Sequence, residues 1–260
     1  MRVVTWNVNS IRSRLPRLLA LLDRHRPDVV LLQETKVEDD AFPHQELATA
    51  GWRAVVHGQR TYNGVAILSR RSATEVRIGF PGDPIPEQAR VISAEVGPLR
   101  LIDAYVVNGK AVGDEKYEIK LRWLDAFADW LAAAHDPSQP LLVAGDFNIA
   151  PEDRDVHDPE RWRGKVLCSE PERERLRRLL AWGLTDLHRL HEEGPGPFTW
   201  WDYRMGAFPR GWGLRIDLLL GTAPVAAACT AVVVDREERR ESAGEGKPSD
   251  HAPVLADLAL

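Results

Sequence analysis

The stretch LLVAGDFNIAP, residues 141–151, decides how the rest of the chain is interpreted. Its first residues, Leu141–Ala144, form an apolar run typical of a buried strand, and that run ends at Gly145. Asp146 and Asn148 follow, and alternation along a strand would place both side chains on one side. A simple turn explains the segment as well, because Asp and Asn side chains bond their own backbone. The alternative is a ligand site at the carboxyl end of the strand, where open α/β sheets bind ligands.

The composition indicates a globular protein and excludes several other classes. The chain has 260 residues, 44% hydrophobic and 28% charged, with a formal net charge of −5. A polyanionic partner would therefore have to be met by a local basic patch and a metal ion. Cys168 and Cys229 fit no zinc or disulfide spacing, and no apolar run approaches the roughly 20 residues that cross a bilayer. We expect a soluble cytoplasmic protein, without a membrane partner, that acts as a monomer.

Short apolar runs bounded by Gly, Pro, Asn or Asp predict ten strands, and helical periodicity is clear in three segments. The predicted strands are Val3–Trp6, Val29–Leu32, Ala54–Val56, Val65–Leu68, Val91–Val96, Leu99–Val106, Leu141–Ala144, Ile216–Leu220, Cys229–Val234 and Val254–Leu258. The predicted helices are Leu15–Arg24, Glu115–Ala133 and Glu172–Trp182.

Several predicted strands follow one another directly, as in hairpins, so a strict β-α-β alternation is excluded. This order predicts a four-layer α/β sandwich, in which two mixed or antiparallel sheets pack face to face with helices outside. No linker divides the chain, so residues 1–260 are expected to form a single domain. The most polar segment, Asp235–Ser249, is predicted to be a mobile charged loop.

Polar side chains recur where the predicted strands end. Taken singly, each has an ordinary explanation: a turn cap, a solvated acid, or an ion pair such as Asp217 with Arg215. Their recurrence at five strand ends instead favours a site for Mg²⁺ or Mn²⁺, which prefer carboxylate and amide oxygens. His188 and His191 lie three residues apart with no Glu or Cys arranged around them, and they are interpreted as surface residues. The residues at these five strand ends are Asn7, Asn9, Glu34, Asp146, Asn148, Asp217, Asp250 and His251, and Tyr105 and Asn108 stand at the end of a sixth strand.

Seven motifs resemble the exonuclease III family of AP endonucleases, which belongs to the endonuclease/exonuclease/phosphatase fold. The resemblance runs in order from residue 2 to about residue 256. FTWWDYR followed by GLRID (213–217) is the narrowest signal and indicates DNA repair nucleases. The motifs are TWNVNSIR (5–12), LQETK (32–36), YNGVAILSR (62–70), GDFNIAP (145–151), FTWWDYR (198–204), RIDLLL (215–220) and SDHAPV (249–254).

The resemblance implies a metal-dependent catalytic site. Glu34 would be the principal ligand of Mg²⁺ or Mn²⁺, Asp146 would orient or deprotonate the attacking water, and Tyr105 would contact the scissile phosphate. His251, oriented by Asp217, would bond a non-bridging phosphate oxygen. The implied metal and base cluster is Asn7, Glu34, Asp146, Asn148, Asp250 and His251, and the catalytic set is Tyr105, Asp146, Asn148, Asp217 and His251.

The implied function is DNA repair by phosphodiester hydrolysis on duplex DNA, through incision 5′ to abasic sites, 3′→5′ exonuclease activity, or removal of 3′ blocks. Another phosphoesterase of the fold, or a DNA-binding module without catalysis, remains an alternative. Two residues depart from the family pattern, namely Gly211 in place of Asn and Val107 in place of Pro. Both are expected in loops near the DNA.

Basic and aromatic residues are candidates for contacts with phosphates and bases. For Lys116 and Lys120, one helical turn apart, a solvated helix face is the alternative. One of Trp200 and Trp201 is expected in the core. The candidates are Arg12, Lys110, Lys116, Lys120, Arg204, Arg210 and Trp212.

Overall fold

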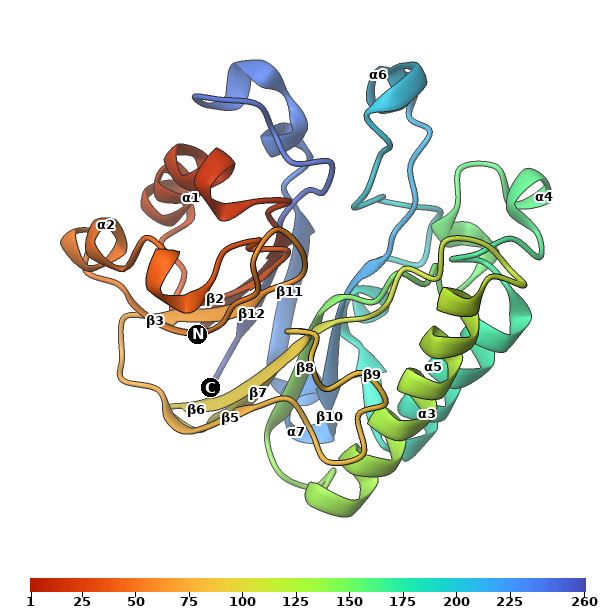
Figure 1. Cartoon of the computed structure of the whole chain (residues 1–260), viewed down its shortest axis with the longest axis horizontal. Coiled ribbons are helices and arrows are strands. Elements are labelled where there is room, and N and C mark those ends of the chain that lie inside the picture. The colour runs from red at the N-terminus through yellow and green to blue at the C-terminus, as the bar shows by residue number, and fades with distance from the viewer.

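The computed structural model describes residues 1–260 and contains two six-stranded sheets (Figure 1). Their neighbouring strands are antiparallel except for two parallel pairs, β1–β2 and β7–β8. The first sheet has the order β11 (Cys229–Val234), β12 (Val254–Leu258), β1 (Arg2–Asn7), β2 (Val29–Gln33), β4 (Val65–Ser69) and β3 (Arg53–His57). The second has the order β5 (Thr74–Ile78), β6 (Val91–Val96), β7 (Leu99–Tyr105), β8 (Leu141–Asp146), β10 (Asp217–Thr222) and β9 (Leu184–Asp186).

The layers are helix, sheet, sheet, helix, which confirms the predicted four-layer α/β sandwich (Figure 1). Inner-face residues of both sheets, such as Leu31 and Leu101, form one buried core. The outer face of the first sheet packs against α1 (Ile11–His25) and α2 (His44–Thr49), and that of the second against α3 (Glu115–Ala134) and α5 (Glu170–Trp182). The shorter helices are α4 (Pro159–Trp162), α6 (Ala207–Arg210) and α7 (Ala223–Ala228). Single 3₁₀ turns are η1 (Asp39–Ala41), η2 (Asp153–Asp155), η3 (Leu187–Leu190), η4 (Arg204–Gly206), η5 (Arg236–Arg239) and η6 (Glu241–Ala243). No helix is long and apolar enough to span a membrane.

The predicted helices exist, and side-chain caps explain where two of them, α3 and α5, begin. The side chain of Asp114 accepts the backbone N–H of Lys116 at the start of α3. Ser169 and Glu172 form a reciprocal capping box at the start of α5, two residues before the predicted boundary. Helix α1 begins four residues earlier than predicted, at Ile11.

Two edge strands were not predicted. All five residues of β5 are exposed, so this strand carries no apolar run. Strand β9 has only three residues. Both strands are held by backbone pairing to β6 and β10, which leaves little trace in side-chain pattern.

The charged segment Asp235–Ser249 is a loop, as predicted, and its mobility stays a prediction. It contains η5 and η6, and the Arg17 side chain of α1 is 0% exposed beneath it. The Arg17 guanidinium donates to the carboxylate of Glu238 at 3.0 Å and to the backbone oxygens of Arg240, Glu241, Gly244 and Gly246. A single buried arginine therefore satisfies the carbonyls of this polar segment and fixes it against α1.

The parallel pairs bring the carboxyl ends of four strands to one edge of the sandwich. In the register of the strands, Asn7 lies beside Gln33, and Tyr105 lies beside Asp146. Asp217 lies opposite Asp146 because β10 runs antiparallel to β8. The polar residues that follow these strands consequently meet at one place.

Candidate active site

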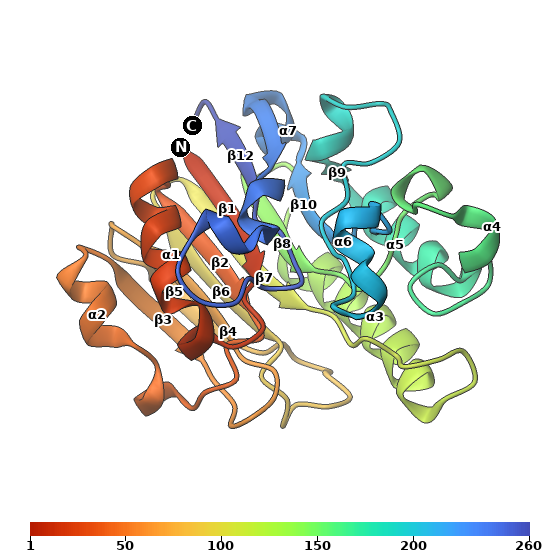
Figure 2. The ribbon, with the colours of Figure 1, turned by 90° about the horizontal axis from the view of Figure 1, so that it is seen from above.

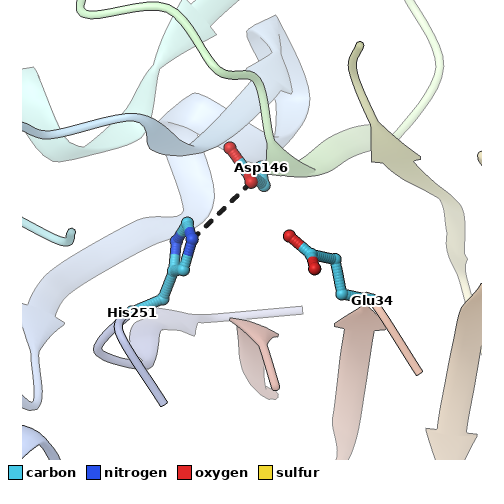
Figure 3. Close-up of side chains that lie close together, drawn as sticks. All are labelled: Glu34, Asp146 and His251. Atoms are coloured by element: carbon cyan, nitrogen blue, oxygen red, sulfur yellow. Dashed lines mark ion pairs between the residues drawn. The ribbon is translucent and has the colours of Figure 1, made fainter. Parts of the chain in front are cut away.

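Glu34, Asp146 and His251 converge at this edge, from β2, β8 and the segment before β12 (Figure 3). One ligand atom of each lies within 4.8 Å of the others. Glu34 and His251 belong to the first sheet's side of the molecule, and Asp146 ends a strand of the second. The cluster thus spans the junction between the two sheets.

Asn7 bridges the two carboxylates. Its Nδ2 donates to Glu34 Oε1 at 2.9 Å and to Asp146 Oδ2 at 2.9 Å. Its Oδ1 accepts the backbone N–H of Asn9 at 3.0 Å. Asn7 therefore presents its nitrogen, rather than the oxygen expected of a metal ligand, and holds the carboxylates at a fixed separation.

The GDFN segment forms a turn, and its Asp146 side chain also faces the cluster. The Asn148 backbone N–H donates to Asp146 Oδ1 at 2.9 Å, which is the turn bond, and Asp146 also faces the cluster. The Asn148 amide donates to the backbone oxygen of Val106 and accepts from Asn108. Asn148 and Glu34 both adopt the left-handed backbone, with φ of 51° and 53°. Such strain outside glycine is typical of functional positions.

His251 is oriented by Asp217, because its Nδ1 lies 2.9 Å from Asp217 Oδ2. The alternative partner of Asp217 is excluded, since Arg215 instead bonds Asp155 and Asp186 on the other side. Burial opposes a charged imidazole, but the charges of Asp217 and Asp146 outweigh it and raise the pKa of His251 to about 10. His251 Nε2 lies 3.8 Å from Asp146 Oδ2. A protonated imidazole donates a hydrogen bond and cannot bind a metal, so this geometry favours the donor role of His251.

The two carboxylates have different proton affinities. Burial, reinforced by Asp217 and Glu34 and opposed by His251, raises the pKa of Asp146 to about 7. For Glu34 burial acts in the same direction, yet Lys36 at 2.7 Å and Asn7 reverse it and lower the pKa of that carboxyl. Separated values of this kind are typical of an acid–base pair, with Asp146 suited to take a proton near neutral pH.

Tyr105 contributes its hydroxyl to the same cluster. The hydroxyl donates to Glu34 Oε1 at 3.0 Å, and the guanidinium of Arg90 lies 4.8 Å from the ring centroid. Burial and the neighbouring Glu34 charge raise the pKa of Tyr105 well above its usual value, so the phenol stays a donor. Arg90 also donates to the backbone oxygen of Tyr105.

Asp250 lies beside the cluster but outside its three-residue core. Its carboxylate accepts from Asn9 Nδ2 at 2.8 Å and from Trp200 Nε1 at 3.1 Å. Burial opposes the charge of Asp250, and the His251 charge together with these bonds lowers the pKa of the carboxyl. Asn9 was recognised in the sequence only as a strand-end residue.

Three other residues at the site were not identified from the sequence: Lys36, Arg90 and Trp200. Lys36 and Trp200 stand inside the family motifs, which was an available signal, whereas Asn108, like Asn9, was recognised as a strand-end residue. Arg90 has no such signal, because only folding brings it to Tyr105.

The donor set fits a hard divalent cation. Two carboxylates approach one another with only Asn7 between them, and no thiolate is present. A cation held mainly by Glu34, with Asp146 alongside, would offset the like-charge contact that contributes to the raised pKa of Asp146.

The DNA-contact candidates divide into three groups. Arg12 and Lys116 are exposed, and Lys110 and Arg204 are exposed but paired with Asp114 and Asp202. Arg210 is also exposed, and its guanidinium lies 4.6 Å from the ring centroid of Trp212.

Lys120 is the exception, and the prediction that it contacts DNA is wrong. Its side chain is 0% exposed and bonds Glu172 and the backbone oxygen of Asn148, so neither DNA contact nor a solvated face is available to it.

Three other expectations are settled by burial. Trp201 is in the core and Trp200 is half-buried, as expected. His188 is buried, so the prediction of a surface residue is wrong, whereas His191 is exposed.

Val107 is buried in the core under α3 and cannot touch a substrate directly. Gly211 ends α6 with a left-handed φ of 70°, a conformation that glycine adopts without strain.

The sandwich and its strand-end carboxylates define a class of phosphoesterases, and a model of the Endonuclease/Exonuclease/phosphatase family matches residues 4–251. The chain is 35% identical to exodeoxyribonuclease III of Haemophilus influenzae, over 99% of this chain and 100% of that protein. The chain therefore belongs to the exonuclease III and AP endonuclease family, as its motifs predicted.

Two solved structures superpose on the whole chain. One is the 3′ phosphatase NExo from Neisseria bound to a product DNA hairpin, with a TM-score of 0.95 and 42% identity. The other is an AP endonuclease from Archaeoglobus fulgidus, with a TM-score of 0.93 and 34% identity. Both alignments cover 100% of each chain.

Proposed function

We propose that this chain is a metal-dependent DNA repair phosphodiesterase that trims or unblocks 3′ ends and incises duplex DNA 5′ to abasic sites. The single observation that carries the proposal is the convergence of Glu34, Asp146 and the Asp217–His251 pair at one edge of the sandwich. The similarity to NExo and to the Archaeoglobus AP endonuclease supports DNA as the substrate.

In the proposed reaction, water attacks the phosphorus and the 3′-oxygen leaves. Asp146, with its raised pKa, takes the proton of the attacking water. The protonated His251 donates from Nε2 to a non-bridging phosphate oxygen while Asp217 holds its Nδ1. The hydroxyl of Tyr105 stands beside Glu34, where it can donate to the same phosphate. Mg²⁺ or Mn²⁺ at Glu34 would supply Lewis-acid neutralisation of the phosphate charge.

Most of the rate enhancement should come from positioning and charge, since the bond change needs little covalent help from the protein. The fixed bonds of Asn7 and Asn148 serve positioning, because they hold Asp146 in one orientation before substrate arrives. A single donor such as His251 is expected to contribute about 10²–10³-fold, as oxyanion-hole donors do.

The test uses three duplexes: one with a single abasic-site analogue, one with a nick bearing a 3′-phosphate, and one with plain recessed 3′ ends. Each is incubated with Mg²⁺, with Mn²⁺, or with excess EDTA. We expect incision, phosphate release or trimming only when a divalent cation is present. Activity that survives complete chelation, or hydrolysis of a phosphoinositide but not of DNA, would contradict the proposal. The same assay ranks the three DNA substrates.

A further inference from the structure

A second, strongly basic pocket lies outside the catalytic cluster. It has a volume of about 640 Å³ and lies between the segment 202–209, which includes most of α6, and the loop 236–248. Four cations line it: Arg236, Arg239, Arg240 and Lys247. We call these four residues and the space between them the arginine pocket. On a chain with a net charge of −5, such a concentration of positive charge calls for an explanation.

Three of the four cations have no carboxylate partner. Arg240 pairs with Glu237 at 2.7 Å, but Arg236, Arg239 and Lys247 form no ion pair. The acids at the pocket do not neutralise them. Asp202 is paired with Arg204, and Glu241 is exposed.

Arg239 is the strongest evidence that the arginine pocket binds a ligand. It is only 6% exposed, its Nε has no hydrogen-bond partner, and its terminal nitrogen reaches the backbone oxygen of Trp201 only at 3.5 Å. A buried guanidinium with open donors is unfavourable unless an anion satisfies them. Phosphate oxygens match the planar donor fork of arginine.

Aromatic rings hold these cations in place of carboxylates. The guanidinium of Arg239 lies 5.5 Å from the ring centroid of Tyr203 and 4.9 Å from that of Phe208. Arg236 lies 5.1 Å from Phe208, and the ammonium of Lys247 lies 4.0 Å from Tyr203. The rings are therefore engaged with cations, and the pocket offers positive charge rather than free aromatic faces. This arrangement selects an anion and not a stacked base.

The walls of the arginine pocket are continuous with the catalytic site. The hydroxyl of Tyr203 donates to the backbone oxygen of Pro248 at 2.7 Å. The backbone N–H of Trp201 donates to the backbone oxygen of Asp250 at 3.0 Å. Both segments rise on the side of the molecule where the catalytic strands end (Figures 1 and 2). A DNA strand with one phosphate at His251 would carry further phosphates past these segments.

The geometry points to the arginine pocket as a second phosphate site, which binds a backbone phosphodiester flanking the reactive bond. This inference rests on the proposed function, because it takes DNA as the occupant. It adds Arg236, Arg239 and Lys247 to the residues that bind substrate.

The test compares wild type with the double variant Arg236→Gln/Lys247→Gln, whose residues are exposed and whose loss should leave the fold intact. The control is Arg71→Gln/Arg122→Gln, which removes two exposed, unpaired arginines from elsewhere on the surface. The dissociation constant for an intact duplex is measured in excess EDTA, over a range of salt concentrations. The double variant should bind roughly tenfold more weakly at low salt, and its log–log salt slope should be smaller by about 1–2. The control variant should keep both the wild-type affinity and the wild-type salt slope.

Three outcomes overturn the inference in distinguishable ways. If wild type cleaves DNA and the double variant binds like the control, the second site fails while the proposed function stands. If wild type neither binds nor cleaves DNA, the proposed function fails and this inference fails with it. If inorganic phosphate raises the melting temperature of wild type more than that of the double variant, with equal DNA affinities, the pocket takes a free anion instead.

Discussion

The imidazole of His251 and the carboxylate of Asp217 form a buried pair, with Nδ1 of His251 2.9 Å from Oδ2 of Asp217. His251 is 4% exposed and Asp217 is 1% exposed. Asp217 begins β10 in the second sheet, and His251 precedes β12 in the first. The pair therefore joins the two sheets at the edge where Glu34, Asp146 and His251 meet.

In the proposed reaction the two residues act on one phosphate oxygen, so the effects of their substitutions should not add. We expect Asp217→Asn and His251→Asn each to lower kcat by about 10²–10³-fold, and the double variant to be little worse than the poorer single variant. Steady-state kinetics on the preferred duplex measure this. If the losses multiply in the double variant, or if Asp217→Asn unfolds more easily but keeps its turnover, Asp217 is structural.

Glu34 should carry most of the metal affinity. A neutral amide at this position keeps the shape of the side chain but removes the charge that a divalent cation requires, so Glu34→Gln should weaken Mn²⁺ binding by at least about a hundredfold. Titration calorimetry without DNA measures the affinity directly. The control Glu38→Gln removes an exposed acid four residues away and should leave the Mn²⁺ affinity unchanged. Equal affinities in the two variants would place the metal elsewhere.

Lys120 should matter for stability and not for DNA affinity. Its ammonium is buried with Glu172, so Lys120→Met leaves that carboxylate buried and unpaired, at a cost of about 3–5 kcal/mol in the free energy of unfolding. Lys120→Met/Glu172→Leu should recover part of that loss, because no charge remains buried. Denaturant unfolding measures both variants. A Lys120→Met protein with unchanged stability and weaker DNA binding would restore the original prediction.

His188 should make the protein less stable in mild acid. Burial, together with the neighbouring Arg215 charge, lowers the pKa of His188 to about 4, and neither ring nitrogen has a hydrogen-bond partner. Between pH 6.5 and 4 the unfolded chain binds a proton at this residue and the folded chain does not. The free energy of unfolding therefore has its full value above pH 6.5 and falls as the pH drops towards 4. This residue contributes a loss on the order of 3 kcal/mol.

Removing the ring should flatten this dependence. His188→Leu should be at least as stable as wild type at pH 7 and should lose less stability between pH 6.5 and 4. His191→Leu, which removes an exposed histidine, should follow the wild-type profile. Thermal unfolding across the pH range measures all three proteins. Parallel profiles for His188→Leu and wild type would show that another group causes the acid sensitivity.

The sequence determined the strands that have their own apolar pattern, the three main helices, and the polar residues at the strand ends. Each of these depends on neighbours along the chain: alternation, helical spacing and capping are local properties. Strand β5 was not predicted, because only its backbone pairing with β6 defines it.

Only the tertiary structure decided which charges are paired, because pairing depends on distances between segments far apart in sequence. Lys120 and His188 are ordinary surface residues by type, and packing buries both. Arg17 anchors the 235–249 segment from more than 200 positions away. The candidate active site itself divides between two sheets, with Glu34 and His251 from one and Asp146 and Asp217 from the other. These four side chains meet only once the hydrophobic core between the sheets has formed.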